Sequence, residues 1–229
     1  MSRYVVANWK SHKSLAEASQ WLSRFLKVYR PQSGLKVIIA PAFPFLVPLH
    51  EMLAAGESGV QLASQDISAF PLGSYTGAVA AEMIQELVSY AIVGHSERRR
   101  WFRETDQDVA NKAREALAVG ITPIVCVDQP YARAQFAALS DLEVKESIVG
   151  YGPVEAIGVD MAPSPQRIRG AISELQAMAP DSPILYGGSV QVKNGAEYMK
   201  IPGLSGLMVA TASLDPEKFV DICQLVAEG

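Results

Sequence analysis

Three short polar segments, each directly after an apolar run, carry residues that could act together on an anionic substrate. Lys10 is a compact cation that could stabilise a developing oxyanion. His95 precedes an expected short helix, whose N-terminus would keep the imidazole neutral and able to donate a hydrogen bond. The glycines of segment 187–189 could present backbone N–H groups to a phosphate. Taken alone, such a lysine is more often a solvated surface residue, such a histidine a structural one, and such a glycine segment a plain turn. A catalytic role therefore depends on whether the fold brings the three segments together.

Eight short runs rich in Val and Ile recur along the chain, and each is followed by an amphipathic segment. The runs are nearly continuous in apolar character, as strands of a parallel sheet covered on both faces should be. They predict strands at 4–7, 36–40, 60–64, 90–93, 122–127, 147–151, 184–186 and 206–210.

Capping residues mark where several of the intervening helices begin. Side chains of Ser, Thr and Asp accept hydrogen bonds from free N–H groups of a first turn, and proline is favoured at the first helical position. Such starts lie at Ser14 with Glu17, at Thr105 or Asp106, at Ser164 before Pro165 and at Asp215 before Pro216. The second of these helices should run through Val119, with Gly120 closing it. Further helices are expected near 45–54, 80–87, 130–139 and 191–199.

Two architectures could accommodate this alternation. A closed (β/α)₈ barrel uses eight units in one domain, whereas a doubly wound open sheet has fewer strands and often a glycine-rich first turn. The first turn here is Asn8-Trp9-Lys10, without glycine. The strand count and this turn therefore favour an α/β fold, a single (β/α)₈ TIM barrel domain over residues 1–229.

Composition excludes several classes of protein. The chain of 229 residues is 49% hydrophobic with a net charge of −4, and its one basic run is 98–100, so neither disorder nor nucleic-acid binding is expected. Prolines at 41, 44 and 48 interrupt the most apolar segment, so no membrane span is expected. The two cysteines form no disulfide framework and His12, His50 and His95 share no metal-ligand spacing. A cytoplasmic protein with no bound metal is the expectation.

Five segments of the sequence match motifs of one known family: VVANWK at 5–10, IVGHSERRRWF at 92–102, ALAVGITPIVCV at 116–127, YGPVEAIG at 151–158 and YGGSV at 186–190. Through these segments the sequence resembles the triosephosphate isomerase family along nearly its whole length. The motif GHSERR is highly specific. The resemblance implies a (β/α)₈ barrel whose site lies at the carboxyl ends of the strands.

The resemblance also implies a reaction, the interconversion of dihydroxyacetone phosphate and glyceraldehyde 3-phosphate through an enediolate. A carboxylate would remove a proton next to the carbonyl, Lys10 would stabilise negative charge and neutral His95 would polarise the carbonyl. Asn8 would orient Lys10, and Glu97 would pair with it. The family uses no cofactor.

Thr76 and Gly77 resemble the family's third loop, which reaches into a partner subunit, so the resemblance implies a homodimer. The expected partners are therefore a second copy of the chain and a small phosphorylated or carbonyl metabolite, with no nucleic acid and no membrane.

The sequence departs from the family at the catalytic base. The family carries a glutamate between the Tyr and Pro of Tyr-Glu-Pro-Val at the end of the sixth strand, and here Gly152 stands at that position. Glycine has no group to accept a proton, and general-base catalysis typically contributes about 10²–10⁴-fold. Glu155 lies three residues on, about 10 Å away in an extended chain, and Glu97 is expected to stay with Lys10, so neither is the favoured replacement.

The residues expected to hold the substrate phosphate are Gly158, Ser189, Ala210 and Thr211. Gly158 and Ser189 match the family, but other positions of this phosphate site depart from it. Asp160 follows Gly158 at the tip of the sixth loop, where the family has glycine, and Ala210-Thr211 replaces a glycine pair. A carboxylate repels a phosphate, and side chains limit close backbone approach.

These departures predict that isomerisation of triose phosphates is weak or absent. Two alternatives remain open. The protein could be a non-catalytic barrel that binds another small ligand or a protein partner, or an enzyme that uses Lys10 and His95 on a different carbonyl substrate.

Overall fold

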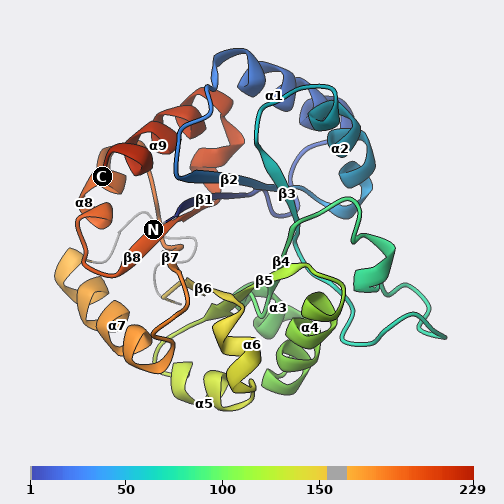
Figure 1. Ribbon diagram of the computed structural model, residues 1–229, viewed down its shortest axis with the longest axis vertical. Helices are drawn as coiled ribbons and strands as arrows, with labels where there is room; N and C mark the ends of the chain where they lie inside the picture. Colours follow the sequence, from blue (N-terminus) through green and yellow to red (C-terminus); the bar gives the residue numbers. More distant parts are fainter. Residues whose placement is uncertain (1, 154–163) are drawn as a thin grey trace.

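The computed structural model describes residues 2–153 and 164–229, and over these it is a closed parallel barrel in the order β1 to β8. The predicted (β/α)₈ architecture is therefore confirmed, and Figure 1 shows the helices surrounding the strands. The strands are β1 (Arg3–Asn8), β2 (Leu35–Ala40), β3 (Gln61–Ser64), β4 (Tyr90–Val93), β5 (Thr122–Val127), β6 (Ile148–Tyr151), β7 (Ile184–Tyr186) and β8 (Leu204–Val209).

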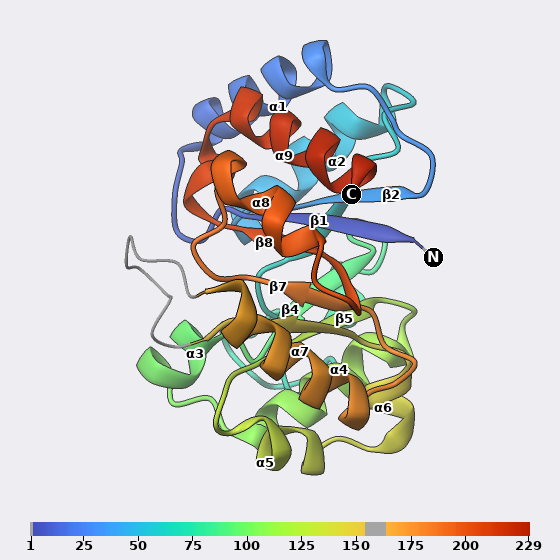
Figure 2. The ribbon, with the colours of Figure 1, turned by 90° about the vertical axis from the view of Figure 1, so that its left-hand side faces the viewer.

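The helices lie outside the barrel, each between consecutive strands or after the last. They are α1 (Leu15–Val28), α2 (Leu46–Ala54), α3 (Ser96–Trp101), α4 (Asp106–Ala118), α5 (Ala132–Ala137), α6 (Asp141–Lys145), α7 (Pro165–Met178), α8 (Val192–Met199) and α9 (Pro216–Glu228), with 3-10 turns at Phe43–Phe45, Ala81–Met83 and Thr211–Leu214. Figure 2 places α3 at the end of the barrel opposite the two chain termini.

The predicted caps form as expected. Ser14 and Thr105 each make a reciprocal capping box, and Ser164 and Asp215 each accept a hydrogen bond from the N–H three residues on. Gly120 follows the end of α4 with φ at +79°, the left-handed conformation that glycine adopts most readily.

The helix predicted over 80–87 is wrong, because only Ala81–Met83 forms a 3-10 turn there. The N–H of Ser89 donates to the carbonyl of Leu62 at 3.0 Å, so the chain must already reach the sheet before β4. The helix expected over 130–139 is shorter than predicted, at Ala132–Ala137, and a separate short helix, α6, follows it.

Alternate residues of each strand point to opposite sides of the barrel wall. One buried cluster fills the interior and includes Val6, Ile92, Cys126 and Met208, while a larger one packs the outer faces of the strands against the helices. The next inward position on each strand therefore lies at the mouth of the barrel, where the loops to the helices begin.

Candidate active site

The turn after β1 fixes the position of Lys10. The backbone N–H of Lys10 donates to Asn8 Oδ1 at 3.1 Å, and Gln65 Nε2 donates to the Lys10 carbonyl at 2.9 Å. The φ angle of Lys10 is +51°, a value that residues other than glycine rarely adopt. The two hydrogen bonds stabilise this backbone conformation. Trp9 anchors the turn because it is fully buried edge-on against Trp21, with ring centroids 4.8 Å apart.

Lys10 then reaches across the mouth to the segment after β4. Its Nζ donates to Glu97 Oε1 at 2.6 Å, and both side chains are only partly exposed. This ion pair holds the ammonium group between the first and fourth strands, beside His95. Asn8 and Glu97 therefore act on Lys10, one through its backbone and the other through its charge.

His95 is the N-cap of α3, and its Nδ1 accepts a hydrogen bond from the N–H of Glu97 at 3.2 Å. Burial lowers the pKa of His95 to about 4; Lys10 and Arg98 act in the same direction, and Glu97 opposes them. The ring is therefore neutral at pH 7. Because Nδ1 is an acceptor, the proton of the neutral ring is assigned to Nε2, which can donate to a carbonyl oxygen.

This depressed pKa predicts a pH-dependent loss of stability. The unfolded chain binds a proton at His95 near pH 6.5, whereas the folded protein does so only near pH 4, so stability should fall as the pH drops between these values. The His95 part of this loss should be about 3 kcal/mol at pH 4, and His95→Gln should remove it. Urea unfolding between pH 4 and 7.5 measures it, and an NMR titration midpoint of His95 above about pH 6 would contradict the prediction.

A cleft of about 1020 Å³ collects most of the predicted site residues at the mouth. Its lining includes Asn8, Lys10, His95, Ser189, Ala210 and Thr211. The structure thus brings the Lys10 and His95 side together with the positions expected to hold a phosphate. Ser189 has φ at +47°, so the turn after β7 bends sharply before α8 begins.

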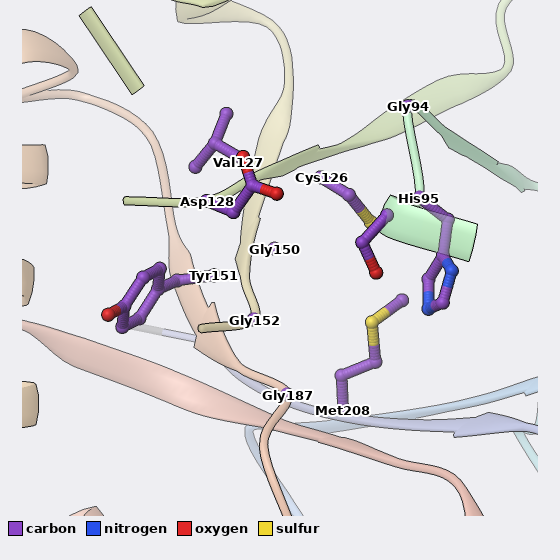
Figure 3. A pocket seen from close by; sticks show the side chains of 11 residues that line it. Gly94, His95, Cys126, Val127, Asp128, Gly150, Tyr151, Gly152, Gly187 and Met208 are labelled. Carbon is purple, nitrogen blue, oxygen red and sulfur yellow. The ribbon is translucent and has the colours of Figure 1, made fainter. Parts of the chain in front are cut away.

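A second cavity, of about 20 Å³, adjoins this cleft where β5 and β6 end. The two share His95, Gly187 and Met208 in their linings. Gly152 lines the small cavity and offers no side chain to it (Figure 3). Asp128 also lines it and is 7% exposed.

Sequence analysis missed Asp128 as a site residue. A signal for it was present, since Cys126 faces the interior and the strand period of two turns position 128 inward as well.

Gly158 and Asp160, expected at the tip of the sixth loop, lie outside the described residues, as does Glu155. Thr76 and Gly77 do not line the cleft but lie on the loop between β3 and the 3-10 turn that starts at Ala81. This loop projects from the barrel in Figure 1.

The basic run after His95 serves the scaffold. Arg98 contacts Asp66 at 2.8 Å and Glu104 at 3.3 Å, and both carboxylates also bind the buried Lys112. This network ties α3 to α4 and to the loop after β3. Arg99 also contacts Asp106, so two of the three arginines of the run are paired with carboxylates of the scaffold.

Among the described residues, no group of three or more His, Cys, Asp or Glu side chains could hold a metal ion. Cys126 and Cys223 are both buried as free thiols. Within the described parts of the chain, no helix is long and apolar enough to cross a membrane.

The model of one protein family, described as triosephosphate isomerase, matches residues 3–226. The chain is similar to triosephosphate isomerase of Thermus thermophilus, 39% identical over 98% of this chain and 99% of that one. It is also similar to those of Symbiobacterium thermophilum, at 36% identity over 98% and 97% of the two chains, and of Aquifex aeolicus, at 35% over 97% and 98%.

Proposed function

Because this chain belongs to the triosephosphate isomerase family, we propose that it is a homologue that still polarises a small carbonyl metabolite but interconverts triose phosphates weakly or not at all. The observation that carries this proposal is Gly152 at the end of β6, in the wall of the cavity beside His95. No proton acceptor stands at the position where the family has its glutamate.

The groups that would stabilise negative charge support binding and polarisation of a carbonyl. Lys10 supplies a fixed cation and His95 supplies a neutral N–H donor, both lining the same cleft. Groups held in place before the reaction stabilise developing charge without reorganisation, which is the largest contribution in many enzymes. This geometry favours a retuned enzyme over a non-catalytic barrel as the second candidate.

The phosphate side of the cleft supports weakened binding of triose phosphate. Ala210 and Thr211 line the cleft where β8 ends, and their side chains limit how closely the backbone approaches a phosphate. Ser189 lines the same side and remains a candidate phosphate contact, together with Gly158. Asp160 would add repulsion if its carboxylate faced the ligand.

We further propose that the chain acts as a cytoplasmic homodimer. Thr76 and Gly77 are exposed on the third loop, where Phe70, Leu72 and Tyr75 are also exposed. Phe70 stacks on Tyr75 with ring centroids 4.6 Å apart, which gives the loop a rigid apolar side suited to a partner subunit.

A coupled isomerase assay tests the proposed function, with the Thermus thermophilus relative measured alongside as the matched control. We expect the kcat/KM of this protein for glyceraldehyde 3-phosphate to be at least about 10²-fold below that of the relative. A value within about tenfold of the relative would contradict the loss of the base.

Binding of 2-phosphoglycolate, followed by thermal unfolding, tests the cleft separately. At 100 times its dissociation constant the ligand should add about 2.7 kcal/mol to the free energy of unfolding. No stabilisation at millimolar ligand would show that the phosphate is no longer held and would favour a different carbonyl substrate or a non-catalytic role.

A further inference from the structure

We propose that Asp128, directly after β5 and next to the strand that lost its base, is the proton-accepting catalytic residue of this site. The inference rests on the proposed function, in which β6 supplies no base. It names the group that would perform any remaining proton abstraction and the class of substrate, a compound with a hydrogen on the carbon next to a carbonyl.

The backbone places Asp128 beside the vacated position. In the β5–β6 ladder Cys126 pairs with Gly150 and Val127 with Tyr151, so Asp128 is the next partner, opposite Gly152. The N–H of Gly152 donates to the carbonyl of Val127 at 3.3 Å, which continues the pairing past the strand ends. Neighbouring strands are about 4.8 Å apart, so a carboxylate on Asp128 starts one strand away from where the family's glutamate begins.

A glutamine on α5 fixes the Asp128 carboxylate. Gln135 Nε2 donates to Asp128 Oδ1 at 2.7 Å, and the backbone N–H of Asp128 donates to Gln135 Oε1 at 3.0 Å. Both residues are buried. No described residue donates a hydrogen bond to Oδ2, so this oxygen keeps its lone pairs for a proton.

The Asp128 carboxylate and His95 lie on opposite sides of the small cavity in Figure 3, and Gly150 and Gly152 lie on the side of Asp128. The cavity of about 20 Å³ has room for one water-sized group, and it shares His95, Gly187 and Met208 with the large cleft. In the proposed mode of binding, the carbonyl oxygen of the substrate meets His95 and Lys10 in the large cleft, and the neighbouring carbon points into the small cavity toward Asp128.

Other side chains of the site are poorer proton acceptors. Glu97 Oε1 is bound by Lys10 at 2.6 Å, which holds that carboxylate on the opposite wall. Burial raises the pKa of the Cys126 thiol to about 12, so it stays protonated. Among the described residues that line the small cavity, Asp128 is the one carboxylate.

The proposed step balances without a cofactor. Asp128 Oδ2 takes the proton from the carbon next to the carbonyl, the C–H electron pair forms the carbon–carbon double bond, and the carbonyl oxygen becomes an oxyanion beside Lys10 and His95. His95 then gives its Nε2 proton to the oxyanion and recovers one from the neighbouring hydroxyl, whose oxygen becomes the new oxyanion. As that oxygen forms the new carbonyl, the electron pair of the double bond takes the proton back from Asp128 at the former carbonyl carbon, so no group is consumed.

Solvent hydrogen exchange tests this step apart from complete isomerisation. With dihydroxyacetone phosphate in D₂O, the wild-type protein should exchange C1 hydrogen faster than buffer does, as followed by ¹H NMR. Asp128→Asn keeps the shape and an acceptor for Gln135, and it should lower the protein-catalysed rate by at least about 10²-fold. Asp181→Asn, in the exposed turn before β7, is the matched control and should leave the rate within about twofold.

A rescue experiment separates a catalytic role from a structural one. Formate added to Asp128→Ala should restore exchange at least about tenfold, because a small carboxylate can enter the space left by the side chain. An unchanged circular dichroism spectrum and an unchanged midpoint of thermal unfolding would show that the variants fold.

Two results would overturn the role of Asp128. One is hydrogen exchange by Asp128→Asn at the wild-type rate. The other is hydrogen exchange by the wild-type protein no faster than in buffer, a result that would still agree with the proposed loss of the base at position 152. If instead the wild-type protein isomerises as fast as the Thermus thermophilus relative and Asp128→Asn abolishes this, the proposed weak activity fails while Asp128 stands.

Discussion

Replacing Gly152 by glutamate should raise the kcat/KM for triose phosphates by at least about 10²-fold and at most about 10⁴-fold. Gly152 lines the cavity beside His95, and Lys10 and His95 line the adjoining cleft, so the substitution adds a carboxylate at the position where the family has its base. We expect the lower part of that range, because Ala210 and Thr211 still limit contact with the phosphate. A coupled assay of initial rates against substrate concentration gives kcat and KM separately.

Gly152→Gln is the matched control for this prediction. Glutamine has nearly the same size as glutamate but accepts no proton, so it should give no gain. An equal gain from both variants would show that the added side chain acts through packing rather than as a base. A gain that appears only in kcat, with KM unchanged, would place the effect on the chemical step.

Position 152 also tests the proposed role of Asp128. In the Gly152→Glu background the new carboxylate supplies the base, so adding Asp128→Asn should change the isomerisation rate by less than about threefold, against at least about 10²-fold in the wild-type background. Similar losses in both backgrounds would mean that Asp128 acts on something other than the proton.

Contacts within single turns are the part of the candidate site that can be expected from the sequence. Asn8 and Lys10 are two residues apart, as are His95 and Glu97, and the structure shows a direct hydrogen bond within each pair. Residues two apart in a turn are close in space whatever the rest of the fold does, so contacts of this kind can be expected from the sequence alone.

Predicting a role for Asp128 requires the pairing of two strands to be known. Its importance follows from standing opposite Gly152 in the β5–β6 register, and nothing in segment 126–129 alone shows which residue of β6 it will face. The predicted helix over 80–87 failed for a related reason. Its local pattern is compatible with a helix, but the backbone bond from Ser89 to Leu62 on the neighbouring strand leaves room for only a short turn.

The closed barrel itself makes one glycine critical, and Gly206→Ala should destabilise the protein by more than about 4 kcal/mol or prevent folding. A Cβ at position 206 would lie 2.0 Å from the Tyr4 carbonyl oxygen and within 3.0 Å of two further Tyr4 backbone atoms. Tyr4 and Gly206 are paired partners in the β1–β8 ladder, which closes the barrel. Because the clash is with backbone, no side chain can turn away to relieve it.

Gly170→Ala supplies the matched control, since Gly170 lies inside α7 and a Cβ there would meet nothing within 4 Å. That variant should gain about 0.5–1 kcal/mol from lower chain entropy in the unfolded state. Urea unfolding followed by circular dichroism measures both, and the two signs should be opposite. If Gly206→Ala unfolds within about 1 kcal/mol of the wild type, the β1–β8 pairing can separate without loss of the fold, and closure of the barrel contributes little to its stability.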